Sequence, residues 1–305
     1  MTGPTARVCG STSSAESCAS SPSSRSAASR VRSPCGGTPR TESCEPVSTV
    51  EGGGRVVLVT GGGTGLGAAT ALRLAEHGYR VHVAGRSRAS LEAVASRAAG
   101  SVVPHELDVR DREACTRVVS AVVDRDDRLD VMVNNAGIFR RGRVSAVSPE
   151  DWRATLETNL TGALHMVQAV VAAFRAQVPD ADGVRGHVVN VNSGAGYSGY
   201  VESAAYTASK FGLAGLSDVL RQEVAAEGVK VTDLVVATAV ESDLSDRVGV
   251  RRLPADRVAR VVRDVLALPG DACVSRIDLT QLPERRSESA AVPAAPRATT
   301  SEEMQ

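Results

Sequence analysis

Short apolar runs alternate with segments of helical spacing along the middle of the chain. The runs are rich in β-branched residues and nearly continuous in Val and Leu, which is typical of strands buried on both faces of a parallel sheet. Each of the first six is followed by a helical segment, directly or after a loop, so right-handed crossovers are expected. The predicted strands cover residues 55–60, 79–84, 101–109, 129–135, 186–192, 229–237 and 273–279. The sequence predicts an α/β fold with a doubly wound sheet of about seven parallel strands, in one domain over residues 54–282.

The two ends of the chain have a different composition. Thirteen of the first fifty residues are serine, the arginines are scattered, and nothing repeats with a period of two or 3.6. We expect residues 1–53 to be a disordered extension. A transit peptide has a similar composition, but an extension from a misassigned start codon is the simpler interpretation. Residues 283–305, rich in Ser, Ala, Pro and Glu, are predicted to be a disordered tail.

Charge and cysteine content exclude several classes of partner. Lys plus Arg equals Asp plus Glu at 35 each, so neither a nucleic-acid footprint nor an acidic tail is visible. No window approaches the roughly 18 apolar residues of a membrane span, and we expect a soluble protein. Four of the six cysteines fall in the first 44 residues, at spacings that match no zinc pattern. Only Cys115 and Cys273 remain in the folded part, which favours a reducing, cytoplasmic location and no metal.

A glycine-rich turn follows the first predicted strand. The segment TGGGTGLG places Thr60, Gly61, Gly65 and Gly67 just before a helix that runs to His77. Without Cβ atoms the backbone can approach a pyrophosphate, whose charge is favoured by the free N–H groups and dipole of the helix. A flexible turn without ligand is the alternative, but the strand before and the helix after favour a dinucleotide site. The domain is thus expected to be a Rossmann-type NAD(P)-binding fold.

The end of the second strand indicates which dinucleotide is bound. NAD sites place a carboxylate here, yet no acidic residue occurs from position 79 to 91, whereas Arg86 and Arg88 do. A guanidinium fits a 2′-phosphate bidentately. NADP(H) is therefore favoured and NAD(H) stays possible, with Arg86, nearer the strand, as the expected phosphate ligand. The alternative is that both arginines are simply solvated at a helix start.

Further motifs follow along the chain: LDV ending at Val109, NNAG at Asn134–Gly137, Asn159 in LETNLTG, Ser193 and YTASK at Tyr206–Lys210. Together with TGGGTGLG, and in this order, they resemble the short-chain dehydrogenase/reductase family over about residues 54–282, and 3-oxoacyl-carrier-protein reductases and other ketoreductases in particular. The resemblance implies a homotetramer or homodimer packed through the helices carrying Asn159 and Tyr206. It also implies a catalytic group of Asn159, Ser193, Tyr206 and Lys210, and a cofactor cleft that includes Leu66, Asp108, Val109, Asn135, Ala136, Gly137 and Ser242, with Asp108 at the adenine ring.

The spacing of Tyr206 and Lys210 indicates how a proton could be transferred. Four residues apart in a helical segment, they share a face. Hydride transfer to a ketone leaves an alkoxide that needs a proton, which a phenol can donate; a nearby ammonium is expected to lower the phenol's pKa. Ser193 can donate to the oxyanion, and the Asn159 amide, in a helix from about residue 149 to 177, could hold a water linked to Lys210.

Each of these residues also has a purely structural interpretation. A Tyr and Lys at this spacing is commonly a solvated pair, a serine after a strand is commonly a turn residue, and an asparagine in a helix commonly packs. Their joint occurrence behind a glycine turn favours catalysis. Two further tyrosines, Tyr197 and Tyr200, are expected to wall the substrate pocket, and FRRGR at 139–143 could meet an anionic substrate or be an exposed loop.

One segment departs from the family pattern. After the sixth strand, Ala237 and Thr238 stand where the family has Pro-Gly, and Ser242 stands where a threonine meets the nicotinamide. The segment from Leu244 to Pro254, which would form a substrate lid, is short and suggests an open pocket. The leading hypothesis is a reductase of a ketone or aldehyde, or the reverse oxidation of an alcohol. A non-catalytic cofactor-binding or regulatory protein is the main alternative; a sugar-nucleotide epimerase or dehydratase fits the glycine spacing less well.

Overall fold

The computed structural model describes residues 53–241 and 252–282, all within one compact unit. The predicted extension and tail, Ser242 and most of the predicted lid lie outside the described residues. The assignment of residues 1–53 and 283–305 as disordered therefore stays a prediction.

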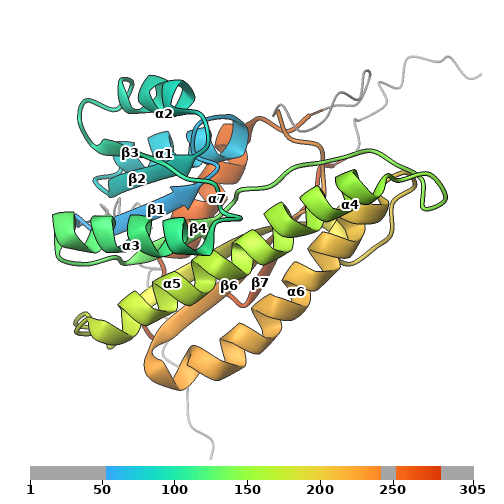
Figure 1. Ribbon diagram of the computed structural model, residues 1–305. Coiled ribbons are helices and arrows are strands. Elements are labelled where there is room, and N and C mark those ends of the chain that lie inside the picture. The colour runs from blue at the N-terminus through green and yellow to red at the C-terminus, as the bar shows by residue number, and fades with distance from the viewer. Residues whose placement is uncertain (1–52, 242–251, 283–305) are drawn as a thin grey trace, which may run out of the picture. The chain divides into compact units, whose positions relative to one another are not determined.

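Seven parallel strands form one sheet in the described part of the chain (Figure 1), which confirms the predicted fold class. Their order is β3-β2-β1-β4-β5-β6-β7, so the chain reverses direction across the sheet between β1 and β4. In such folds ligands bind outside the carboxyl ends of the strands at this reversal. The strands are β1 (Val56–Thr60), β2 (Arg80–Gly85), β3 (Val102–Glu106), β4 (Val131–Asn134), β5 (Gly186–Ser193), β6 (Val229–Val236) and β7 (Arg276–Leu279).

Helices cover both faces of the sheet. They are α1 (Gly65–Glu76), α2 (Arg88–Ala95), α3 (Arg112–Asp126), α4 (Pro149–Leu156), α5 (Gly162–Ala176), α6 (Ala204–Val224) and α7 (Ala255–Leu266), with a π-helical segment η1 (Glu157–Thr161) and the 3₁₀ turns η2 (Gly194–Gly196) and η3 (Ala225–Glu227). In Figure 1, α3, α5 and α6 run across one face, and α1 packs with α7 on the other.

The alternation of side chains along each strand divides the core in two. Val56 and Leu58 belong to the cluster under α3, α5 and α6, whereas Val57 and Val59 belong to the cluster under α1, α2 and α7. All four are fully buried. The near-continuous apolar runs are thus explained, because each strand faces a helix layer on both sides. Burying such a side chain stabilises the fold by roughly 1.5–3 kcal/mol.

The helix predicted over residues 149–177 is present but interrupted. α4 passes into η1 and then α5 without leaving the helical path, and η1 contains Asn159. A π-helical segment inside a helix is rare and is frequently found at functional sites. The last predicted strand is shorter than expected, since only Arg276–Leu279 pair with β6.

Candidate functional site

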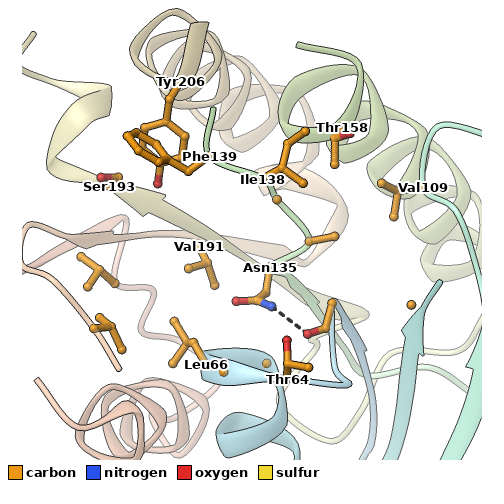
Figure 2. Close-up of a pocket in the computed structure, with 18 of the residues that line it drawn as sticks. Thr64, Leu66, Val109, Asn135, Ile138, Phe139, Thr158, Val191, Ser193 and Tyr206 are labelled. Carbon is orange, nitrogen blue, oxygen red and sulfur yellow. Dashed lines mark hydrogen bonds between the residues drawn. The ribbon is translucent and has the colours of Figure 1, made fainter. Parts of the chain in front are cut away.

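A cavity of about 710 Å³ opens at the carboxyl ends of the strands, beside the reversal between β1 and β4. Figure 2 shows Thr64 and Leu66 from the glycine turn on one side, and Ser193 and Tyr206 on the other. Thirteen of the residues singled out in the sequence line it: Gly61, Gly65, Leu66, Gly67, Arg86, Asp108, Val109, Asn135, Ala136, Gly137, Ser193, Tyr206 and Lys210. Thr60 and Asn159 lie behind the wall.

The glycine turn is held in a shape that favours glycine. Gly61 and Gly65 have φ angles of +64° and +51°. A Cβ on Gly67 would lie 2.2 Å from the Gly61 carbonyl oxygen, so the first turn of α1 packs against the loop itself. The Thr64 side chain makes no capping hydrogen bond, which leaves the first N–H groups of α1 without a side-chain partner. This backbone cradle fits a pyrophosphate.

Thr60 and Asn135 lock the ends of β1 and β4 together. The Thr60 hydroxyl accepts from the backbone N–H groups of Asn135 and Ala136, both at 3.1 Å, and the Asn135 amide donates to the Thr60 carbonyl at 2.9 Å. The Asn135 side chain lies beside the glycine turn in Figure 2. These two residues therefore set the shape of the cavity floor.

The two arginines after β2 have different surroundings. Arg86 lines the cavity. Arg88 is exposed and donates to Glu92, four residues on, at 2.7 Å, which matches the alternative of a solvated helix start. Ser87 caps α2 by accepting from the Ser90 N–H. The guanidinium of Arg86 is thus the cationic group that this strand end brings to the cavity.

Asp108 has a partner that the sequence interpretation did not anticipate. Arg110 donates to both carboxylate oxygens, with its Nη2 2.6 Å from Oδ2, and this contact is the main reason that the pKa of Asp108 is lowered. The pair has the fork geometry of a bidentate bond. A ligand that bonds to Asp108 therefore meets a carboxylate that is ionised and already oriented. The i, i+2 spacing of opposite charges was the available signal.

Tyr206, Ser193 and Lys210 converge on one wall of the cavity. Burial raises the pKa of the Tyr206 phenol, and a hydrogen bond from Ser193 opposes that rise. The Lys210 ammonium lies 5.8 Å from the Tyr206 ring centroid and donates to the Val191 carbonyl at 2.8 Å. The Phe139 ring meets Tyr206 edge to face at 5.1 Å between centroids (Figure 2).

The direction of the Tyr206 pKa shift differs from the sequence-based expectation. A lysine one turn away was expected to lower the phenol's pKa, but burial dominates in the protein alone. Burial acts on the lysine as well and lowers the pKa of Lys210 to about 8. At neutral pH the phenol is therefore protonated and the ammonium is still mostly charged, which suits a proton donor next to a cation.

Asn159 makes hydrogen bonds that were not expected. Its Oδ1 accepts from the Ile138 N–H at 2.7 Å, and its Nδ2 donates to the Ile138 carbonyl at 2.9 Å and to the Ser209 hydroxyl at 3.1 Å. Both amide N–H bonds are thus used within the protein, and the expectation that this amide holds a water for Lys210 stays a prediction. The side chain ties η1 to the cavity loop and to α6.

The two additional tyrosines face different directions. Tyr200 lines the cavity, and a Cβ on Gly194 would meet its hydroxyl at 2.5 Å. Tyr197 is not part of the cavity wall, because its hydroxyl donates to Asp233 and the Arg276 guanidinium lies 3.5 Å from its ring centroid. The prediction that Tyr197 walls the pocket was therefore wrong.

The loop after β6 lies against the cavity despite its altered sequence. Ala237, Thr238, Ala239 and Val240 all line it. The Ala237 N–H donates to the Leu279 carbonyl of β7 at 2.9 Å, and this bond would be impossible for a proline at that position. This hydrogen bond thus anchors the segment to the sheet at the position where the family has Pro-Gly.

The arginines of FRRGR are paired with acids. Arg141 and Arg143 both meet Glu202, and Arg140 lies 3.7 Å from Asp151. These contacts favour the exposed-loop alternative over an anion site. Other residues of the cavity wall were missed in the sequence, among them Ile138 and Thr158, although each directly adjoins a recognised motif residue.

Two kinds of feature are absent from the described residues. None of their helices is long and apolar enough to cross a membrane. No group of three or more His, Cys, Asp or Glu side chains among them could hold a metal ion.

Comparisons with known proteins agree on a family. The family model described as short chain dehydrogenase matches residues 55–251. A 3-oxoacyl-acyl-carrier-protein reductase of Thermotoga maritima is 32% identical over 231 residues, covering 72% of this chain and 91% of the relative. A trans-4-hydroxycyclohexanecarboxylate dehydrogenase of Sinomonas cyclohexanicum is 34% identical over 224 residues, covering 70% and 84%. The crystal structure of a variant actinorhodin polyketide ketoreductase with NADPH superposes with a TM-score of 0.66 at 29% identity, covering 74% of this chain and 95% of that one.

Proposed function

The chain belongs to the short-chain dehydrogenase family of NAD(P)-dependent oxidoreductases, and we propose that it uses NADP(H) to interconvert a ketone or aldehyde and the corresponding alcohol. The observation that carries the proposal is the convergence of Tyr206, Ser193 and Lys210 on the same cavity as the glycine turn. A phenol, a hydroxyl and an ammonium beside a dinucleotide cradle suit proton transfer to an alkoxide.

The residues present fit the cofactor. Gly61, Gly65 and Gly67 form the cradle for the pyrophosphate, and Arg86 is the proposed ligand of the 2′-phosphate. Asp108 would accept from the adenine, and Lys210 would donate to the nicotinamide ribose. When bound, the nicotinamide supplies or accepts the hydride. The similar solved structure with NADPH supports the choice of NADP(H).

The side chains on the cavity wall then transfer the proton to the substrate. Tyr206, whose pKa is raised by burial, is protonated at neutral pH and donates its proton to the carbonyl oxygen as negative charge develops there. The Ser193 hydroxyl bonds to the same oxygen; a comparable donor in acyl-transfer enzymes is worth about 3 kcal/mol. Lys210 stabilises the phenolate that remains.

The cavity wall also suggests what the substrate looks like. Ile138, Phe139 and Tyr200 give it apolar and aromatic surface, which suits a carbonyl compound with an apolar body. The relatives named above act on a 3-oxoacyl chain, a cyclohexane alcohol and a polyketide, by their names. A ketone with an apolar chain or ring is therefore the proposed substrate class.

We also propose that the protein is a homodimer or homotetramer packed through α4 and α6. Trp152 on α4 and Phe211 and Val219 on α6 are 40%, 47% and 52% exposed. Phe211 and Val219 are eight residues apart, so they share one helix face. Light scattering after size exclusion should give two or four copies, and Phe211→Glu should reduce that number; a wild-type monomer would refute this part.

Oxidation of NADPH with a panel of apolar ketones tests the activity. The wild type should turn over at least one ketone, Tyr206→Phe should lose the activity, and Arg88→Ala, at the exposed start of α2, should keep most of it. Equal activity of wild type and Tyr206→Phe would refute the role of the phenol. Binding of NADPH without turnover of any ketone would favour the non-catalytic alternative.

A further inference from the structure

A buried carboxylate lies behind the proposed catalytic group and has no part in the steps above. Asp233 on β6 is 1% exposed. Its Oδ2 accepts from the Asn192 amide at 3.2 Å and from the Tyr197 hydroxyl, and the Ser217 hydroxyl lies 3.5 Å from its Oδ1. A buried charge is unfavourable unless it is paired and hydrogen-bonded, so a carboxylate in this place calls for a partner charge.

One side chain connects this carboxylate to the cavity wall. The Asn192 Nδ2 that donates to Asp233 also donates to the backbone carbonyl of Lys210 at 3.4 Å, and the Asn192 Oδ1 accepts from the Ser193 N–H at 2.8 Å. A single amide thus joins Asp233 to the backbone of two residues of the proposed catalytic group. If the carboxylate is removed, this amide loses one of the three hydrogen bonds that fix its orientation.

The Lys210 ammonium and the Asp233 carboxylate act on each other electrostatically. Lys210 is buried, and its ammonium donates to the neutral Val191 carbonyl. Asp233 is the group that opposes the effect of burial on the pKa of Lys210. Burial raises the pKa of Asp233, and the hydrogen bonds from Tyr197 and Asn192 and the charge of Lys210 oppose that rise. Arg221 of α6 and Arg276 of β7 also act on Asp233, but both lie nearer the protein surface.

We propose that Asp233 is a positioning residue for the catalytic group: its carboxylate is the buried counter-charge of the Lys210 ammonium and, through Asn192, it orients the backbone that carries Ser193 and Lys210. This deepens the proposed function and rests on it, because the charge of Lys210 matters to the reaction only if Tyr206 is the proton donor. The pairing of the two charges can be tested without turnover.

Loss of the negative charge of Asp233 should shift the apparent pKa values of Tyr206 and Lys210 in one direction. Tyr206 and Lys210 are close enough to titrate as a coupled pair, and a negative charge nearby increases the affinity of the pair for protons. Removing it lowers both apparent pKa values of the pair, whichever group releases its proton first. Both limbs of the pH profile should therefore move toward lower pH, by about one unit, the size of shift that one nearby charge produces.

Asp233→Asn is the matched variant. The amide oxygen can accept from Asn192 and Tyr197, and the amide nitrogen can donate to Ser217, so the hydrogen bonds can survive while the charge is lost. The pH dependence of ketone reduction and of alcohol oxidation should shift down together. Asp218→Asn on the exposed face of α6 is the control and should leave both midpoints in place. A lower rate at unchanged midpoints would overturn the proposal.

A thermal double-mutant cycle tests the pairing without activity. In the wild type, Asp233→Asn leaves the Lys210 ammonium buried without its counter-charge. The variant should therefore lower the unfolding midpoint less in a Lys210→Met background, where that ammonium is absent. Equal shifts in both backgrounds would overturn the pairing even if the enzyme were active. Should Asp233→Asn alone fail to fold, a folded double variant would support the proposal and an unfolded one would overturn it.

Discussion

Gly67→Ala should damage the cofactor cradle more than any gain in helix propensity can offset. The new Cβ would lie 2.2 Å from the Gly61 oxygen, 2.8 Å from the Gly61 carbonyl carbon and 2.6 Å from the Asn135 amide nitrogen. Two of these atoms are backbone, so the turn itself must shift. Overpacking of this kind costs about 1–3 kcal/mol, whereas replacing glycine by alanine inside a helix gains at most about 1 kcal/mol.

Because the new Cβ would meet a backbone atom at 2.2 Å, the cost lies at the upper end of that range, and the net destabilisation is about 2 kcal/mol. This lowers the melting temperature of a domain of this size by roughly 4–8 °C. Displacing the turn should also weaken NADPH binding by about tenfold or more, which removes about 1.4 kcal/mol of stabilisation by saturating cofactor. Thermal unfolding with and without NADPH measures both quantities.

Gly199→Ala is the control for this experiment. Nothing lies within 4 Å of the Cβ it would add, so its melting temperature should be unchanged or raised by the reduced entropy of the unfolded chain. Equal melting temperatures and equal NADPH shifts for wild type and Gly67→Ala would refute the reasoning about the cradle.

Three further predictions concern the cofactor, the acid stability and the π-helical segment. Arg86→Ala should reduce the ratio of NADPH to NADH affinity by at least tenfold in a fluorescence titration, while Arg88→Ala, which loses only an exposed ion pair, should leave it unchanged. Burial lowers the pKa of His105 to about 4 and that of His187 to about 3. Their folded values lie below the unfolded value of about 6.5, so stability is complete above that pH and is lost as the pH falls from 6.5 toward 4, by up to about 1.4 kcal/mol per pH unit for each histidine. Urea unfolding between pH 4 and 7 measures this slope, and a flat profile would contradict it. Asn159→Ala removes three hydrogen bonds and should destabilise the protein by about 2–4 kcal/mol in the same assay, whereas a change below 0.5 kcal/mol would show that the amide does not hold the segment.

The sheet and the glycine turn could be predicted because their signals are local. Val56 to Val59 are apolar without interruption, and a strand covered on both faces is the arrangement that accommodates such a run. The turn from Gly61 to Gly67 is similar, since its φ angles favour glycine and the close approach at Gly67 requires it. Because parallel strands end at the same edge of the sheet, residues that follow the strands could be predicted to lie in one site.

What the sequence could not supply depends on distant contacts. The π-helical segment is fixed by the bonds of Asn159 to Ile138 and Ser209, which lie 21 and 50 residues away. Tyr197 points to Asp233 rather than into the cavity, and spacing says nothing about the direction of a loop side chain. The pKa of Tyr206 rises because burial outweighs the lysine, a balance that only the packed structure reveals. Arg88 is the exception, since Glu92 four residues on was a readable partner.

A structure of the protein crystallised with NADP⁺ is the most direct test of the central claim that one cavity unites cofactor and proton donor. The account predicts the pyrophosphate on the turn from Gly61 to Gly67, the 2′-phosphate on Arg86 and the nicotinamide beside the Tyr206 hydroxyl. A nicotinamide bound away from Tyr206, with Ser193 and Lys210 facing other groups, would contradict it.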